Sequence, residues 1–424
     1  MAKNIKTKKF PKGNNGKKLV FRKNCRICFG KNFHKIINLG EMPPANAFLG
    51  QDELKRAEEQ FPLSLYFCND CGLVQLRHVV DPEILFKNYH YQTSASAPLV
   101  KHFREMALEI ASKHIKNADE LVVEIGSNDG VLLENLKQSA RVLGVDPDEK
   151  MAEIANSRGV PTLTGFFNKN TAKEILKNHG QAKVIVANNV LAHIDDLHSV
   201  IDGVKILLSG NGRFIFEAHW VGNLIGNGGY DQIYHEHLCY FSLHSISRLA
   251  KKFGLKVLDV ALVPIHGESL KVTIGKNGSV NKSVEMFLKK EKKLGLEKSA
   301  TYEKFSKKVK TNKKELVKLL KQLKKDGKTI VGYGAPAKGN TLLNYCGIGP
   351  DILDFITDTT PIKQGLFTPG TRIPIMHPEK VHQTTPDYIL LLAWNYAPEI
   401  LKKETALRKK GVKFIIPVPQ VRIV

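Results

Sequence analysis

The sequence predicts an α/β protein built around a doubly wound parallel sheet. From about residue 120, apolar strands alternate with glycine-containing turns and helices, which is the pattern of such a sheet. The same alternation restarts in a smaller unit near residue 327. The chain has 424 residues, enough for about two to four domains, and its 42% hydrophobic and 25% charged residues are an ordinary globular composition.

Residues 1–20 form a basic tail, and residues 21–80 read as a turn-rich domain of short strands that contains two C-x-x-C pairs. Zinc prefers four soft ligands in a tetrahedron, and two such pairs brought together supply them. We expect a structural Zn²⁺, because a closed site of four thiolates has no open position for a substrate. The expected ligands are Cys25, Cys28, Cys68 and Cys71. Two unrelated pairs or a redox motif are the alternative, and His34 is a weaker candidate ligand.

Residues 81–282 form the predicted main domain, in which residues 81–115 are a linker that becomes an amphipathic helix. The segment "VVEIGSNDG" ends a strand in a glycine turn, where the backbone can approach a bound nucleoside. Asp146 ends the next strand, 146 − 126 = 20 residues after Gly126, and a carboxylate there can hold ribose hydroxyls. Glu124 would repel a pyrophosphate but suits a cofactor with an amino group, which favours S-adenosylmethionine over NAD.

The candidate cofactor residues lie in the turns at the carboxyl ends of predicted strands, where open α/β sheets bind ligands. They are Glu124, Gly126, Ser127, Asn128, Gly130, Asp146, Asn188 and Asn189. A purely structural turn between strand and helix is the alternative for the glycine loop. His193 follows the two asparagines, at the mouth of the same expected crevice.

The segment "YHEHLCYFS" at residues 234–242 places His235, Glu236 and His237 in succession beside a predicted strand. It is not the H-E-x-x-H pattern of a zinc-protease helix, because no histidine stands in the required position. Consecutive titratable residues are a costly way to build a core, so we expect a functional cluster. The alternative is a buried aromatic–histidine strand with satisfied polar groups, and Cys239 is expected to serve packing.

Two later motifs contain candidate substrate contacts. "HGESLKV" supplies His266, Ser269 and Lys271, which either cap a hairpin or contact substrate. Residues 283–326 form a lysine-rich helical connector, and residues 327–424 form the second α/β unit, in which "APEILKKETALRKKG" reads as one helix. The turn "GYGAPAKGN" in this unit offers Lys338 to a phosphate, with Asn340 close by. It either cradles a diphosphate or is the vestige of a dinucleotide site.

The net charge of +23 comes from 64 Lys and Arg against 41 Asp and Glu, and lysines concentrate in the tail and the connector. Solvated faces explain these runs better than nucleic-acid binding does, because aromatic residues are not interleaved with them. No apolar run approaches the roughly 20 residues of a membrane span, and the N-terminus lacks the apolar stretch of a signal peptide. We expect a cytoplasmic protein without a membrane or nucleic-acid partner, and a monomer is favoured.

The motifs occur in a defined order: paired C-x-x-C knuckles, "YHYQTSAS", "EIGSNDG", "NNVLAHIDD", "YHEHLCYFS", "HGESLKV" and "GYGAPAKGNTLLN". In this order they resemble the S-adenosylmethionine-dependent sugar C-methyltransferases, from about residue 25 to the end. The resemblance implies an N-terminal zinc-binding domain, a central Rossmann-like class I methyltransferase domain and a C-terminal Rossmann-like domain. Glu268 departs from the pattern, because the family loop often has a second glycine there.

The family acts on nucleotide-linked keto-deoxysugars, so the resemblance implies a nucleotide-diphosphate 4-keto-6-deoxysugar that is methylated beside its ketone through an enolate. It implies that His237 is the general base and that Glu236 orients His237 or the sugar. The residues that would contact the sugar or the developing enolate oxygen are Tyr234, His193 and either Tyr91 or Tyr89. The chemistry agrees, because an imidazole with a pKa near ~6.5 is a suitable base at neutral pH.

Two other functions fit parts of the sequence. A zinc-containing nucleic-acid-binding protein, or an RNA or DNA methyltransferase, would account for the charge and predicts salt-dependent affinity for nucleic acid. An NAD-dependent sugar oxidoreductase would use the C-terminal unit and predicts that nicotinamide binds near "GYGAPAKG". The interpretation as a sugar C-methyltransferase is favoured, because the resemblance to that family covers all the motifs quoted above.

Overall fold

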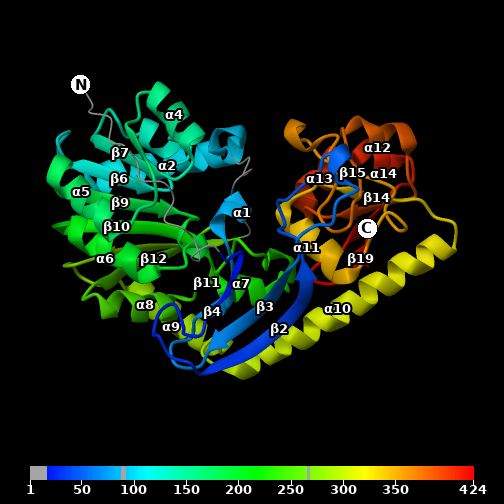
Figure 1. The fold of residues 1–424 in the computed structure, drawn as a ribbon, viewed down its shortest axis with the longest axis horizontal. Coiled ribbons are helices and arrows are strands. Elements are labelled where there is room, and N and C mark those ends of the chain that lie inside the picture. Colours follow the sequence, from blue (N-terminus) through cyan, green and yellow to red (C-terminus); the bar gives the residue numbers. More distant parts are fainter. Residues whose placement is uncertain (1–16, 87–91, 265–267) are drawn as a thin grey trace.

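The computed structural model describes residues 17–86, 92–264 and 268–424, and these residues form sheets in three regions of the molecule (Figure 1). The main parallel sheet lies at the left of Figure 1 and the C-terminal sheet at the right, with the N-terminal strands β2 and β3 below and between them. None of the described helices is long and apolar enough to cross a membrane.

The N-terminal domain is an antiparallel sheet with strand order β11-β4-β3-β2. Its strands are β2 (Phe33–Met42), β3 (Phe61–Cys68), β4 (Val74–Leu76) and β11 (Cys239–Tyr240). A separate pair joins β1 (Leu19–Phe21) to β5 (His78–Val80), and a 3-10 turn, η2, spans Gln51–Glu53. In the register of β11 with β4, Cys239 lies opposite Gln75. The chain that follows the "YHEH" motif therefore extends the N-terminal sheet.

The central sheet has strand order β12-β13-β10-β9-β6-β7-β8. Its strands are β6 (Leu121–Ile125), β7 (Arg141–Asp146), β8 (Thr162–Thr164), β9 (Ala182–Asn188), β10 (Leu208–His219), β12 (Lys256–Val263) and β13 (Ser269–Gly275). The strands from β10 to β8 in this order are parallel, as the sequence predicts, whereas β13 and β12 add an antiparallel edge. Because the parallel strands point the same way, the carboxyl ends of β6, β7, β9 and β10 share one edge.

Helices and short 3-10 turns connect these strands. The helices are α1 (Pro82–Phe86), α2 (Ala97–His114), α3 (Val131–Glu134), α4 (Glu149–Ser157), α5 (Lys169–His179), α6 (Leu197–Leu207), α7 (Val221–Gly226) and α8 (Leu243–Lys252), and the turns are η3 (Thr93–Ala95), η4 (Leu191–His193) and η5 (Tyr230–Gln232). The predicted amphipathic helix is α2, which buries Phe103 and Ile110. α8 begins where the Ser242 hydroxyl accepts a hydrogen bond from the Ser245 amide, at 3.1 Å.

The lysine-rich connector consists of α9 (Lys282–Leu294) and α10 (Ser299–Lys325). Of the leucines in the apolar stripe of α10, Leu316, Leu320 and Leu323 are buried and Leu319 is partly buried. α10 packs against β2 and against α11 (Ala337–Cys346), and Figure 1 shows it running from the N-terminal sheet to the C-terminal domain. Most of its lysines face solvent, as expected for an amphipathic connector.

The C-terminal domain is a second parallel sheet with strand order β16-β15-β14-β17-β18-β19, in which β19 is antiparallel. Its remaining elements are β14 (Ile330–Tyr333), β15 (Ile356–Thr357), η6 (Pro361–Lys363), β16 (Ile375–Met376), α12 (Glu379–Thr384), β17 (Tyr388–Leu391), η7 (Trp394–Tyr396), α13 (Ala397–Lys403), α14 (Thr405–Lys409), β18 (Lys413–Ile416) and β19 (Arg422–Ile423). The single helix expected over residues 397–411 is wrong. It is broken at Glu404, whose buried carboxylate turns inward to accept a hydrogen bond from the Tyr333 hydroxyl at 2.7 Å.

One hydrophobic core joins the three regions. Leu65 of β3, Ile185 of β9, Leu316 of α10 and Ile330 of β14 belong to the same cluster of buried side chains. The domains are therefore packed against one another through apolar contacts rather than tethered by linkers.

Candidate metal centre and active site

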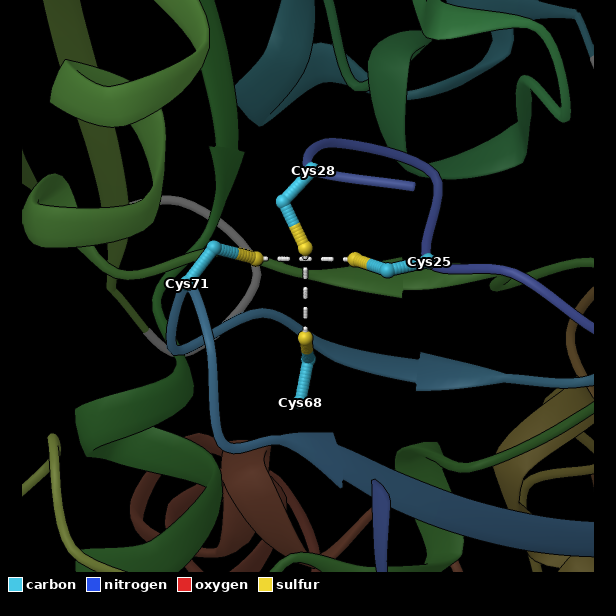
Figure 2. Close-up of side chains that lie close together, drawn as sticks. All are labelled: Cys25, Cys28, Cys68 and Cys71. Atoms are coloured by element: carbon cyan, nitrogen blue, oxygen red, sulfur yellow. Dashed lines mark hydrogen bonds between the residues drawn. The ribbon is translucent and has the colours of Figure 1, made fainter. Parts of the chain in front are cut away.

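The four predicted cysteine ligands converge at one point. The Sγ atoms of Cys25 and Cys71 are 3.5 Å apart, those of Cys28 and Cys68 are also 3.5 Å apart, and all four lie within 4.8 Å of one another (Figure 2). A tetrahedron with Zn–S bonds of about 2.3 Å has sulfur–sulfur distances of about 3.8 Å. The cysteine set therefore fits Zn²⁺. His34 is not part of it and instead lies 3.8 Å from Glu303.

Hydrogen bonds from amide groups to the cysteine sulfurs favour the thiolate form that binds a metal. The Ile27 amide donates to Cys25 Sγ at 3.4 Å, the Gly30 amide donates to Cys28 Sγ at 3.3 Å, and Gln75 Nε2 donates to Cys25 Sγ at 3.1 Å. Such contacts stabilise thiolates and orient them toward the ion. With Cys25, Cys68 and Cys71 buried, the site is closed and structural.

The loop after β6 has the geometry of a cofactor-binding turn. Gly126 has a φ of +68°, and a Cβ atom at this position would meet Val190 Cγ2 at 2.4 Å, so the turn needs glycine. The Asp146 carboxylate accepts hydrogen bonds from the amides of Asn128, at 2.7 Å, and Asp148, at 2.9 Å. Asp146 therefore braces the loop that starts at the neighbouring strand. Its contact with a ribose stays a prediction.

Several buried polar atoms at this edge have no hydrogen-bond partner among the described residues. They are Glu124 Oε2, Ser127 Oγ, Asp129 Oδ1, Asn188 Oδ1 and Asn189 Oδ1. Burial, with Asp146 and Asp129 nearby, raises the pKa of Glu124 well above its usual value, and burial raises the pKa of Asp146 to about 6. Buried polar atoms are normally hydrogen-bonded, so these fit a ligand that brings donors. S-adenosylmethionine, with its ammonium and ribose hydroxyls, is such a ligand.

Asp129 fastens the linker to the same loop, and the sequence interpretation did not single it out. Its Oδ2 atom accepts hydrogen bonds from Arg158 Nη1 at 3.2 Å, Gln92 Nε2 at 3.2 Å and the Ser94 amide at 3.3 Å. The place of Asp129 between Asn128 and Gly130 in the glycine loop is the signal that could have found it. The predicted Tyr89 and Tyr91 precede this clamp and lie outside the described residues.

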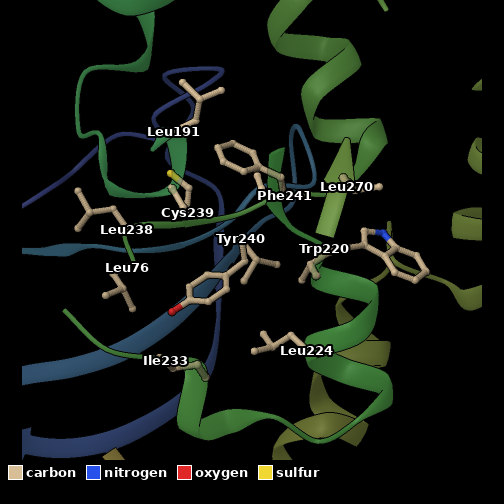
Figure 3. Packing of buried hydrophobic residues seen from close by; sticks show 14 of the residues in the cluster. Leu76, Leu191, Trp220, Leu224, Ile233, Leu238, Cys239, Tyr240, Phe241 and Leu270 are labelled. Atoms are coloured by element: carbon tan, nitrogen blue, oxygen red, sulfur yellow. The ribbon is translucent and has the colours of Figure 1, made fainter. Parts of the chain in front are cut away.

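Two hydrogen bonds hold the imidazole ring of His237 in place. Its Nδ1 atom donates to the Gln232 carbonyl oxygen at 3.0 Å, because a carbonyl can only accept. Its Nε2 atom lies 2.8 Å from the Tyr234 hydroxyl oxygen, and in the neutral imidazole it accepts a hydrogen bond from that hydroxyl. Immediately after His237, residues Leu238–Phe241 enter the apolar core (Figure 3). Burial raises the pKa of the Cys239 thiol to about 12, which agrees with a packing role for this residue.

Two more imidazoles surround His237. The rings of His193, in η4 after β9, and His219, at the end of β10, each have centroids 5.0 Å from that of His237. Burial lowers the pKa of His193 to about 4, so it is neutral at physiological pH. His219 is absent from the sequence interpretation, although its place at the carboxyl end of a parallel strand is a signal that could have found it.

The other two members of the motif contact the N-terminal domain. His235 Nε2 donates to the Phe61 carbonyl at 3.1 Å, and burial lowers the pKa of His235 to about 4, so this residue is a structural tie. Glu236 Oε1 accepts a hydrogen bond from Asn46 Nδ2 at 3.0 Å. Burial raises the pKa of Glu236 to about 7, against its own backbone amide and Asn46, which favour the ionised form.

The chain is similar to a C-methyltransferase over nearly all of its residues. It is 38% identical over 405 residues to the C-methyltransferase NovU of Streptomyces niveus, covering 94% of this chain and 96% of that protein. The chain belongs to the C-methyltransferase family. Family models match in three consecutive parts: a zinc binding domain over residues 25–86, a methyltransferase domain over 99–260, and a C-methyltransferase C-terminal domain over 264–419. S-adenosylmethionine is the methyl donor of this C-methyltransferase, and Zn²⁺ is its structural metal.

Solved structures show only a partial likeness. The magnesium protoporphyrin IX methyltransferase of Synechocystis, bound to SAH, is 14% identical and covers 42% of this chain and 83% of its own, with a TM-score of 0.34. An S-adenosylmethionine-dependent methyltransferase of Clostridium acetobutylicum is 16% identical and covers 46% of this chain and 96% of its own, also at 0.34. These likenesses support no statement about substrate.

The predicted substrate residues of the C-methyltransferase lie in different places. Ser269 is buried opposite His219 in the β10–β13 register, next to the cluster of His193, His219 and His237. Lys271, two residues further along β13, has its Nζ atom 2.6 Å from Glu109 Oε2 and lines a separate cavity of about 370 Å³. His266 lies outside the described residues.

Lys338 and Asn340 lie where the C-terminal domain meets the other two. Lys338 donates to Asn395 Oδ1 and its Nζ atom lies 4.0 Å above the Trp394 ring, and burial lowers the pKa of Lys338 to about 8. Asp231, from the methyltransferase domain, accepts a hydrogen bond from Trp394 Nε1 at 2.6 Å and was also missed. Asn340 Nδ2 donates to the Ala45 carbonyl at 2.7 Å, so this amide nitrogen joins the C-terminal domain to the N-terminal domain.

Proposed function

We propose that the enzyme moves a methyl group from S-adenosylmethionine to a ring carbon beside the ketone of a nucleotide-linked 4-keto-6-deoxysugar. The observation that supports this most is the pair of hydrogen bonds at His237. With Nδ1 bound to the Gln232 carbonyl, the neutral form of the ring turns its Nε2 lone pair toward the Tyr234 hydroxyl, 2.8 Å away. A carbon beside a carbonyl is a poor nucleophile until it loses a proton. A base and a hydroxyl donor side by side are what an enolate mechanism needs.

In the proposed mechanism, His237 Nε2 takes the proton from the ring carbon, and the C–H electron pair moves into an enolate. His237 Nδ1 stays hydrogen-bonded to the Gln232 carbonyl, which also stabilises the imidazolium that forms. Tyr234 shifts its hydroxyl from Nε2 to the developing enolate oxygen, and neutral His193 is placed to contact the sugar. When bound, S-adenosylmethionine would supply the methyl group from its sulfonium, because the neutral thioether that remains is a good leaving group. Tyr89 or Tyr91 would contact the sugar or the developing enolate oxygen, and Glu236 would orient His237 or the sugar.

We assign substrate contacts to two further regions. Ser269 is proposed to contact the sugar, because it lies next to His219 at the cluster. Lys338 is proposed to contact the diphosphate from the C-terminal domain. Asn340 Oδ1, which has no hydrogen-bond partner among the described residues, is proposed to accept a hydrogen bond from a hydroxyl or N–H group of the nucleotide. For Lys271 and His266 the predicted substrate role stays a prediction, and for Lys271 it requires that the ammonium leave Glu109.

The function is tested by mass spectrometry of nucleotide 4-keto-6-deoxysugars incubated with the enzyme and S-adenosylmethionine in heavy water. We expect a methyl group on a ring carbon, and deuterium beside the ketone when the methyl donor is omitted. His237→Gln should lower both reactions by about 10²–10⁴ while S-adenosylmethionine affinity, measured by calorimetry, stays within about twofold. Undiminished deuterium uptake in His237→Gln would remove His237 from the role of base. Methylation of nucleic acid instead of sugar would support the alternative suggested by the charge.

A further inference from the structure

Residues 43–49, here called the bridging loop, lie where all three domains meet. Ala45 accepts the hydrogen bond from Asn340 of the C-terminal domain, and Leu49 exchanges two backbone hydrogen bonds with Phe367, at 3.0 and 2.9 Å. The Asn46 amide group donates to Glu236 of the methyltransferase domain at 3.0 Å. A short piece of the zinc domain is thus bonded on one side to the catalytic motif and on the other to the C-terminal domain.

Glu236 depends on this loop because its carboxyl group is enclosed. The residue is 1% exposed, and its Oε2 atom has no hydrogen-bond partner among the described residues. Asn46 is its side-chain donor from the zinc domain. The titratable groups around it are His235 and His237 on the same segment, His193 of η4 and Tyr240 of β11, whose pKa Glu236 helps to raise.

We propose that Asn46 is a positioning residue of the methyl-transfer site: it holds the Glu236 carboxyl group in the catalytic cluster, so that the zinc domain completes the active site of another domain. This inference rests on the proposed function, in which Glu236 orients His237 or the sugar. Without the Asn46 amide, an enclosed carboxyl group has one fewer donor, and it either rotates or binds its proton more tightly. Either change would affect methyl transfer only through Glu236.

A double-mutant cycle tests this dependence. Asn46→Ala should lower kcat/KM by roughly tenfold, mainly through kcat, because a hydrogen bond to a charged group is lost. In a Glu236→Gln background, the same Asn46→Ala change should lower kcat/KM by less than about twofold, since the group it acts on is no longer a carboxylate. Equal losses in both backgrounds would overturn the proposal, because Asn46 would then act independently of Glu236.

Asn38→Ala is the matched control. Asn38 belongs to the same domain, and its Oδ1 atom accepts hydrogen bonds from Ser64 Oγ and the Gly40 amide, each at 3.0 Å. The Asn38→Ala substitution removes an asparagine of the zinc domain that does not contact Glu236, so kcat/KM should change by less than about twofold. A loss in Asn38→Ala equal to that in Asn46→Ala would show general damage to the domain and contradict the proposal.

A readout without turnover separates this inference from the proposed function. With ¹³C-labelled glutamate, the Glu236 carboxyl signal is assigned by its absence in Glu236→Gln, and its titration is followed in wild type and in Asn46→Ala. We expect the pKa of Glu236 to rise in Asn46→Ala, because the amide favours the ionised carboxylate. An unchanged titration would overturn the contact. A shifted titration in an enzyme that methylates none of the keto-sugars would support the contact and refute the proposed substrate.

Discussion

In the candidate site, burial and hydrogen bonds to the backbone decide which side-chain atoms carry protons. The Gln232 carbonyl fixes the tautomer of His237, and burial keeps His193 and His235 neutral. Burial raises the pKa of Glu236 to about 7, so its protonation changes near neutral pH, as does that of Asp146, whose pKa is about 6. Within the "YHEH" motif, we expect Glu236 to contribute to the pH dependence of stability.

Glu236→Gln should stabilise the ligand-free protein at high pH. Burial raises the pKa of Glu236 from its usual 4.5 to about 7, so the folded state binds this proton more tightly than the unfolded chain. Stability associated with this proton is complete below pH 4.5 and is lost as pH rises through 7. At pH 8 the substitution should raise the free energy of unfolding by about 2–3 kcal/mol, and at pH 5 it should have little effect. Chemical denaturation at the two pH values measures the difference, and an equal effect at both would contradict it.

Glu268 is a second residue with a specific physical cost. It is exposed and has a φ of +75°, a conformation that favours glycine, at the position where the family loop often has one. Glu268→Gly should therefore raise the free energy of unfolding by about 0.5–1 kcal/mol, through relief of backbone strain. Glu268→Ala is the control, because alanine keeps the strained Cβ atom. A gain of the same size in Glu268→Ala would assign the effect to charge instead.

At the scale of elements, the turns after the parallel strands decide where ligands can bind. The loop after β6 is bonded to Asp146 at the end of β7, and the clamp at Asp129 ties it to the segment before α2. The strand–turn–helix pattern predicts such a loop, but the hydrogen bonds that brace it join residues from separate turns. These hydrogen bonds can form because neighbouring parallel strands end at the same edge of the sheet.

Gly126→Ala should weaken S-adenosylmethionine binding by about 10-fold to 100-fold. A methyl group there would contact Val190 at 2.4 Å and would have to adopt a φ of +68°. Either the turn opens or Val190 moves, and both change the surface presented to the cofactor. Calorimetry with S-adenosylhomocysteine measures the loss. Gly210→Ala is the control, because its Cβ atom would have nothing within 4 Å, and a similar loss there would reject the steric explanation.

At the scale of the whole molecule, the metal centre and the active site share one folded unit. β11, which follows the "YHEH" motif, pairs with β4 of the zinc domain, and a continuous apolar core joins both to the C-terminal sheet. Loss of the metal should therefore be felt beyond the zinc domain.

Cys71→Ser should reduce bound zinc from about one ion per chain to near zero, because a tetrahedral site needs all four thiolates. We expect Tm to fall by about 10 °C and methyl transfer to fall with it, as the bridging loop loses its support. Metal analysis and thermal unfolding measure both effects. Cys239→Ala is the control: it removes a buried cysteine outside the metal centre, so zinc content should be unchanged. Full activity in zinc-free Cys71→Ser would show that the metal centre and the active site are independent.

The local features of this protein could be predicted from its sequence. The alternation of strands and helices, the four cysteine ligands and the glycine loop each depend on residues a few positions apart, where backbone sterics and ligand spacing decide the outcome. The antiparallel edge of the central sheet and the break at Glu404 were not predicted, because a buried contact with a distant residue overrides the local pattern at Glu404.

By itself, the sequence determined the family, the methyl donor and the cysteines of the zinc centre. Only the tertiary structure decided which side chains meet: Asn46 with Glu236, Lys271 with Glu109, and Asn340 with Ala45. These partners are 190, 162 and 295 residues apart, and no short-range pattern links them. Their pairing follows from how three apolar surfaces pack into one core, which places the polar groups at the rims of those surfaces in contact.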